Sequence, residues 1–198
     1  MGSIIGLSLW VALATVIPGM VTIAVVWLAF VIANGGDLST LPFNFDQTSD
    51  WIVTSIAVTV MVMTQALGII LEKMMIQWKW YGTRKKEELA KMDSEPMGWY
   101  DAYKKLYPQL ARLKESDDAK GHLERAIAQF FMTNNTLVSF SVGLVTSVIL
   151  LGQGPGNPVG LWWYAGALVL CLAVTYRVAV SRFRILGESF LAVYQDQS

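Results

Sequence analysis

The chain contains 198 residues, of which 54% are hydrophobic and only 15% are charged. Soluble domains carry about 25% charged residues, so this composition argues against a freely soluble protein. Fifteen Lys and Arg balance fifteen Asp and Glu, which leaves no net positive charge to attract nucleic acid. A single cysteine, Cys171, and a single histidine, His122, exclude a disulfide framework and the metal motifs that need several such ligands. We therefore expect no metal, no resident cofactor and no nucleic-acid partner.

Four apolar runs are long enough to cross a bilayer, which requires about 20 apolar residues in a helix. The first run lacks a basic segment before it and a cleavage site after it, so it predicts a retained transmembrane helix. The predicted fold class is all-α, a polytopic integral membrane protein with a four-helix bundle in the lipid bilayer. Helical patterns extend the third helix back to near Ser116 and the fourth helix on to near Tyr194. The runs cover about residues 4–33, 51–78, 127–151 and 161–180.

Basic residues are confined to one side of these predicted spans. Residues 34–50 and 152–160 contain no Lys or Arg, whereas twelve basic residues lie between Lys73 and Arg125. Since short loops rich in Lys and Arg stay in the cytoplasm, we expect both termini to be cytoplasmic, in a plasma membrane or a bacterial inner membrane. The chain then divides into two spans in residues 1–78, a cytoplasmic helical segment in 79–126, and two spans with a cytoplasmic helix extension in 127–198.

The predicted cytoplasmic segment carries one apolar helix face. Its apolar and aromatic residues recur at helical spacing, although Pro108 is expected to bend or split the helix. Such a face predicts a surface that docks on a partner protein or on further copies of the chain. The residues of this face are Trp99, Tyr103, Leu106, Leu110 and Leu113.

Small and polar residues form a stripe along each predicted span. Small residues let membrane helices approach closely, and hydroxyl and amide groups form hydrogen bonds between helices. The Pro18-Gly19 pair in the first span also permits a kink. The stripes are compatible with helix packing and with the lining of a pore, and the sequence leaves both interpretations open. Their main residues are Thr15, Pro18, Gly19, Thr22, Gln65, Gly68, Asn134, Asn135, Ser139 and Gly143.

Two charged residues, Glu72 and Arg177, lie inside the second and fourth runs. Charged side chains at membrane depth are costly and face the bundle interior or water. Counted along the helices, both lie towards the predicted cytoplasmic ends, so we predict that they form an ion pair. The alternatives are that each side chain extends separately to the interface, or that they take part in ion or proton movement.

Sequence motifs of the common enzyme classes are absent, since there is no nucleophile elbow, phosphate-binding loop or dinucleotide fingerprint. We therefore expect a non-catalytic membrane subunit that packs within a larger assembly, with itself or with other membrane subunits. The alternative is an oligomeric ion channel or pore, and a membrane-embedded enzyme is a distant third. Four spans with cytoplasmic termini are similar to the arrangement in large-pore channels, a likeness of topology that transfers no residues.

Overall fold

The computed structural model describes residues 2–37, 50–78, 80 and 118–195. Within these residues the chain forms four α-helices, each of which contains a stretch long and apolar enough to cross a membrane. This confirms the all-helical fold class and the four apolar spans expected from the sequence. The predicted docking face with Trp99, Tyr103, Leu106, Leu110 and Leu113 lies outside the described residues. The helices are α1 (Gly2–Ala33), α2 (Asp50–Gln77), α5 (Asp118–Gly152) and α6 (Pro158–Gln195).

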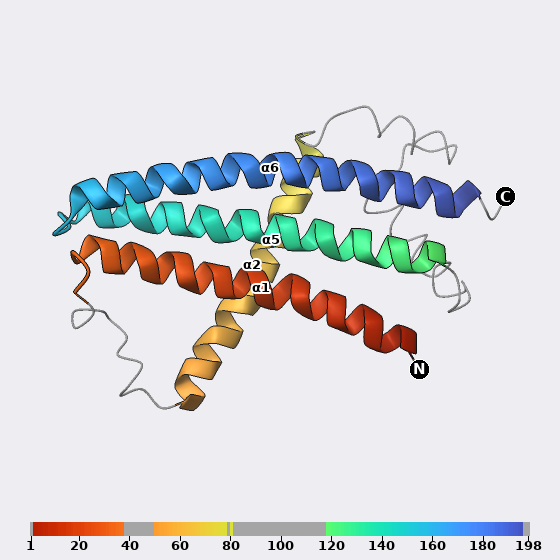
Figure 1. Cartoon of the computed structure of the whole chain (residues 1–198), viewed down its shortest axis with the longest axis horizontal. Coiled ribbons are helices and arrows are strands. Elements are labelled where there is room, and N and C mark those ends of the chain that lie inside the picture. Colours follow the sequence, from red (N-terminus) through yellow and green to blue (C-terminus); the bar gives the residue numbers. More distant parts are fainter. Residues whose placement is uncertain (1, 38–49, 79, 81–117, 196–198) are drawn as a thin grey trace.

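Helices α1, α5 and α6 run side by side, and α2 crosses them steeply (Figure 1). Helix α5 is continuous over 35 residues and α6 over 38, as the uninterrupted helical patterns predict. The start of α1 and the end of α6 lie at the same end of the bundle (Figure 1). Helix α2 contacts mainly α1 and α5, so it joins the bundle on one side only.

Helix α6 begins at Pro158, directly after the turn from α5, and Asn157 caps its N-terminus. Asn157 Oδ1 accepts a hydrogen bond of 2.9 Å from the backbone N–H of Gly160, and proline is well suited to the first position of a helix. The backbone N–H of Asn157 also donates to the carbonyl of Ala33 at 3.2 Å. This bond holds the end of α1 against the α5–α6 turn.

Two apolar clusters lie towards opposite ends of the bundle. The first joins α2, α5 and α6 around Phe130, whose ring centroid is 5.7 Å from that of Phe183. The second joins the end of α1 to α5 and α6 around Ala29, Leu150 and Leu161. Buried polar residues also lie on α1, α2 and α5, among them Thr22, Thr64, Asn135 and Ser139.

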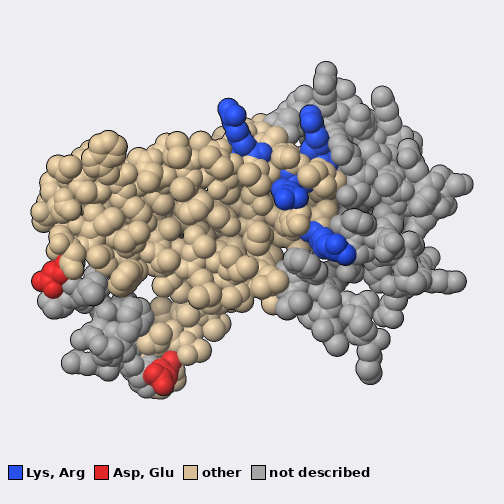
Figure 2. Space-filling view, viewed as in Figure 1, with Lys and Arg blue, Asp and Glu red and all other residues tan. Residues whose placement is uncertain are grey.

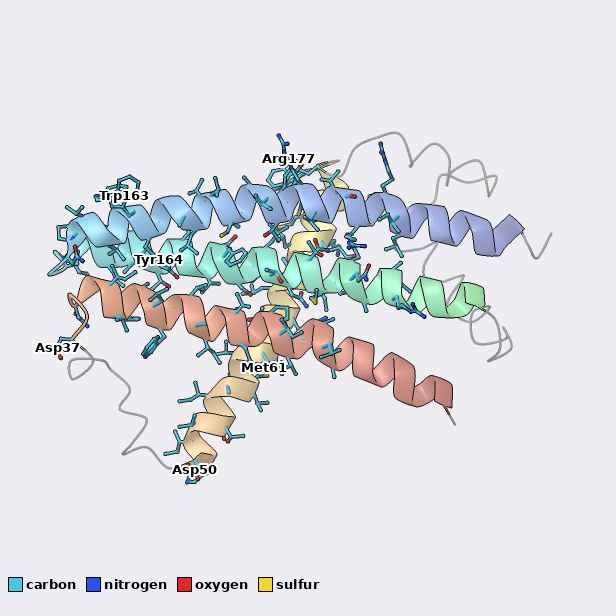
Figure 3. The ribbon with its side chains drawn as sticks, viewed as in Figure 1. Asp37, Asp50, Met61, Trp163, Tyr164 and Arg177 are labelled. Carbon is cyan, nitrogen blue, oxygen red and sulfur yellow. The ribbon has the colours of Figure 1, made fainter. Side chains whose placement is uncertain are left out.

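Charge is segregated along the bundle. The described Lys and Arg side chains gather towards one end, and the acidic side chains of Asp37 and Asp50 lie towards the other (Figures 2 and 3). The asymmetry read along the sequence is therefore also an asymmetry in space.

Candidate functional site

The buried polar residues meet where α2 crosses α1 and α5, beside the proline in α1. Pro18 has no backbone N–H, so the carbonyl of Ala14, four residues earlier, lacks its usual helical partner. Asn135 on α5 supplies that partner, because its Nδ2 donates to the Ala14 carbonyl at 2.9 Å. The side-chain amide of Asn135 on α5 thus replaces the hydrogen bond that Pro18 removes from α1.

A chain of three buried hydroxyl groups ends on the carbonyl of Pro18. Ser139 Oγ lies 2.7 Å from this carbonyl oxygen, Thr22 Oγ1 lies 2.9 Å from Ser139 Oγ, and Thr64 Oγ1 lies 3.1 Å from Thr22 Oγ1. Each hydroxyl has one proton to donate. One consistent arrangement therefore runs from Thr64 to Thr22, from Thr22 to Ser139, and from Ser139 to the carbonyl. Consecutive bonds of this kind polarise and strengthen one another.

Gln65 links the same three helices through its side-chain oxygen. Its Oε1 accepts hydrogen bonds from Asn135 Nδ2 and from Thr15 Oγ1, the latter at 3.3 Å. Both amide protons of Asn135 are therefore used, one on Ala14 and one on Gln65. This orients the amide, because its NH₂ group must face the two acceptors. The remaining atom, Asn135 Oδ1, is buried and has no hydrogen-bond partner.

Two glycines allow the steep crossing of α2. A Cβ atom on Gly19 would lie 2.8 Å from the Cα of Met61, so any larger residue would push α1 and α2 apart. A Cβ atom on Gly68 would overlap Asn135 Oδ1. The third predicted glycine, Gly143, faces Val25 of α1, and a Cβ there would lie 2.9 Å from Val25 Cγ2.

The predicted ion pair between Glu72 and Arg177 is not formed, although the structure describes both residues. Glu72 is only 5% exposed and lies one turn after Gly68, on the face of α2 that is directed into the bundle. Arg177 is exposed and its side chain extends away from the other helices (Figure 3). Depth along a helix, from which the pair was predicted, does not determine which way a side chain faces.

Most of the other predicted stripe residues belong to this crossing. Asn134 and Asn135 are both buried on α5, and Pro18, Gly19, Thr22, Gly68 and Ser139 are buried among the helices. Sequence reasoning missed the carbonyl of Ala14 and the bond from Tyr164 Oη to the carbonyl of Val25, at 2.8 Å. The first could have been found, since a proline within a helix always leaves the carbonyl four residues earlier without its partner.

The arrangement as described offers hydrogen bonds between helices and one buried carboxyl group. Among the described residues, no group of three or more His, Cys, Asp or Glu side chains could hold a metal ion. Comparison with protein-family models, with curated proteins and with solved structures finds no match to this chain.

Proposed function

We propose that this chain is a non-catalytic integral membrane subunit that packs through α2 against other transmembrane helices in a larger assembly. The observation that carries the proposal is the exposure of the first half of α2. No residue from Asp50 to Met63 is buried. Only 11% of the apolar span of α2 is buried, against 33% for α5. Met61 packs against Gly19 of α1, and a partner helix on this half of α2 would bury the residues that the described helices leave uncovered.

The side chains on this half suit a contact between membrane helices. Thr54, Ser55 and Thr59 are exposed, and their hydroxyls donate to backbone carbonyls one turn earlier, at 2.7, 2.7 and 2.8 Å. The hydroxyls are therefore satisfied in an apolar environment. They are also small, and small residues allow the close packing on which helix association in lipid depends.

The segregation of charge supports an orientation for this subunit. If the end that carries the described Lys and Arg faces the cytoplasm, as basic segments do, both termini are cytoplasmic. This orientation fits a plasma membrane or a bacterial inner membrane. An impermeant thiol reagent tests it on Gly154→Cys in a Cys171→Ser background, because the new cysteine would then react in intact cells.

An oligomeric pore remains the second candidate, and the internal hydrogen bonds argue against it. A path lined by Thr15, Thr22, Gln65 or Ser139 needs these side chains to face water. Each of them instead bonds to another residue of the same chain. Their polarity is accounted for by packing within one subunit.

Photocrosslinking in the membrane tests the proposal. A benzoylphenylalanine at position 58 should capture another copy or another membrane protein, because Val58 lies on the exposed half of α2. The same group at position 169 is the matched control, since Val169 on α6 is also a valine and is 52% exposed, against 53% for Val58. Native mass spectrometry of gently solubilised protein should show a defined assembly.

Two results would contradict the proposal. One is a stable monomer that gives no crosslink from position 58 beyond that from position 169. The other is a ring of identical copies that conducts ions in liposomes, which would favour the pore.

A further inference from the structure

Asn135 carries a buried acceptor that lacks a donor. The residue is 1% exposed, and both of its amide protons are already used on Ala14 and Gln65. Its Oδ1 has no hydrogen-bond partner, which is unusual for a buried polar atom. A donor at this position would complete the polar cluster.

Glu72 is a buried carboxyl group that can supply this donor when it is protonated. It forms no ion pair or hydrogen bond with another described residue. An ionised carboxylate that is buried without a partner is strongly unfavourable, so burial favours the neutral form. A neutral carboxyl group has one O–H to donate.

The geometry of α2 brings this donor towards the acceptor. Glu72 follows Gly68 by four residues and shares its face of the helix. Helical side chains lean towards the N-terminus, so the side chain of Glu72 is long enough and directed to reach back over Gly68. Gly68 has no side chain to block it, and Asn135 Oδ1 lies directly against Gly68.

We propose that Glu72 and Asn135 form a proton-binding site at the crossing of α2 and α5, in which the neutral Glu72 carboxyl donates a hydrogen bond to Asn135 Oδ1 over Gly68. The ligand is a proton, which binds to the carboxylate oxygen and leaves it on deprotonation. Because the same Asn135 amide also holds α1 and Gln65, loss of the proton would disturb the contacts of α2 with both neighbouring helices. The site adds a proton-dependent control to an assembly that packs through α2.

Among the residues that the structure describes, no positive charge pairs with Glu72 in place of the proton. Among the described basic residues, Lys73 follows Glu72 directly on α2, and Arg125 lies on α5. Both are exposed. On α6, Arg182 donates to Gln129 Oε1 at 2.7 Å, and no ion pair joins Glu72 to Arg182, Arg177 or Arg184. The hydroxyls of Tyr164 and Tyr176 on α6 donate to the backbone carbonyls of Val25 and Trp80. The described span of α1 contains no charged residue.

The test uses dicyclohexylcarbodiimide, an apolar reagent that modifies neutral carboxyl groups in apolar surroundings. The full-length protein in detergent is treated from about pH 5 to about pH 9, a range that covers the ionisation of buried carboxyl groups. Mass spectrometry then measures the modified fraction of Glu72. We expect modification at acid pH that falls about tenfold or more as the pH rises, and no effect of added Na⁺ at fixed pH. Asp50, exposed at the start of α2, is the internal control and should stay unmodified.

Two variants separate the proton site from its surroundings. Asn135→Ala removes the acceptor, so the neutral carboxyl is less stabilised and modification should decline at a lower pH. Ser147→Ala removes a buried hydroxyl of α5 that bonds to the Gly143 carbonyl of its own helix, and it should leave the pH profile of Glu72 unchanged. If Asn135→Ala does not fold, the pH dependence of Glu72 modification in the protein without substitutions still tests the proposal.

Three results would overturn the proposal. They are no modification of Glu72 at any pH, modification that does not depend on pH, and protection by Na⁺, which would assign the site to a metal cation. None of them affects the crosslinking from position 58, so the two proposals fail independently.

Discussion

The two halves of α2 belong to one apolar helix but differ in burial, although Met61 in the first half packs against Gly19 of α1. In the second half, Thr64, Gly68, Glu72 and Met75 are buried at spacings of four, four and three residues, which is one face of a helix. The first half, from Asp50 to Met63, has no buried residue. Apolar character therefore does not decide which part of the helix packs.

What distinguishes the packed half is complementarity with its neighbours. Gly68 leaves room for Asn135, and Thr64 faces Thr22 at hydrogen-bond distance. Gln65 receives donors from two other helices. If these helices lie in a bilayer, as we propose, apolar surface alone does not drive them together, and such small and polar contacts determine the packed face.

The largest effect is expected where the packed half is closest to its neighbour. Gly68→Val places a side chain where Asn135 Oδ1 lies, and overpacking of this kind should destabilise the folded protein by about 3 kcal/mol. Gly166→Val on α6 is the matched control, because a Cβ there has no atom within 4 Å. Thermal unfolding in detergent should separate the two variants, and equal stabilities would mean that the crossing is not close-packed.

Asn135 and Pro18 should be coupled, because the amide replaces the N–H that the proline lacks. Asn135→Ala leaves the Ala14 carbonyl buried without its donor and should cost about 2 kcal/mol. Pro18→Ala restores that donor, so the double variant should be milder than the sum of the single variants by about 1 kcal/mol. Thermal stabilities of the four proteins complete the cycle, and strict additivity would refute the coupling.

Serine hydroxyls allow a direct comparison of the two environments. Ser139→Ala removes the shorter of two hydroxyl contacts to the Pro18 carbonyl, the other being from Thr22, and should destabilise the protein by about 1 kcal/mol. Ser55→Ala removes a hydroxyl from the exposed half of α2, where it bonds only to its own helix, and should change the stability by less than about 0.5 kcal/mol. The ratio of the two effects is read from the same unfolding assay. A larger effect at Ser55 in the purified assembly than in the monomer would identify a contact there.

The smallest effect is expected at the outer face of α6. Arg177 is exposed and makes no ion pair with Glu72, so Arg177→Gln should change the stability by less than about 0.5 kcal/mol. The effects of Glu72→Gln and Arg177→Gln should then add in the double variant. A coupling energy well above the error of the unfolding measurement would instead be evidence that Glu72 and Arg177 form an ion pair.

Much of this architecture was predictable from local sequence, because the length and apolarity of a segment are properties of the segment itself. The four segments long and apolar enough to cross a membrane, the continuous α5 and α6, and the residues of the polar stripes all follow from composition and helical spacing. The proline in α1 even marks the carbonyl that needs a new donor.

Only the tertiary structure decided which stripes meet and which way each charged residue faces. Spacing along a helix gives depth, but the rotation of a helix about its axis and the angle at which it crosses its neighbours depend on contacts with residues far apart in sequence. This is why Glu72 faces the bundle while Arg177 faces outward, and why Asn135 meets Ala14 across 121 positions of sequence. It is also why the second half of α2 has a buried face, whereas the first half has no buried residue although Met61 touches α1.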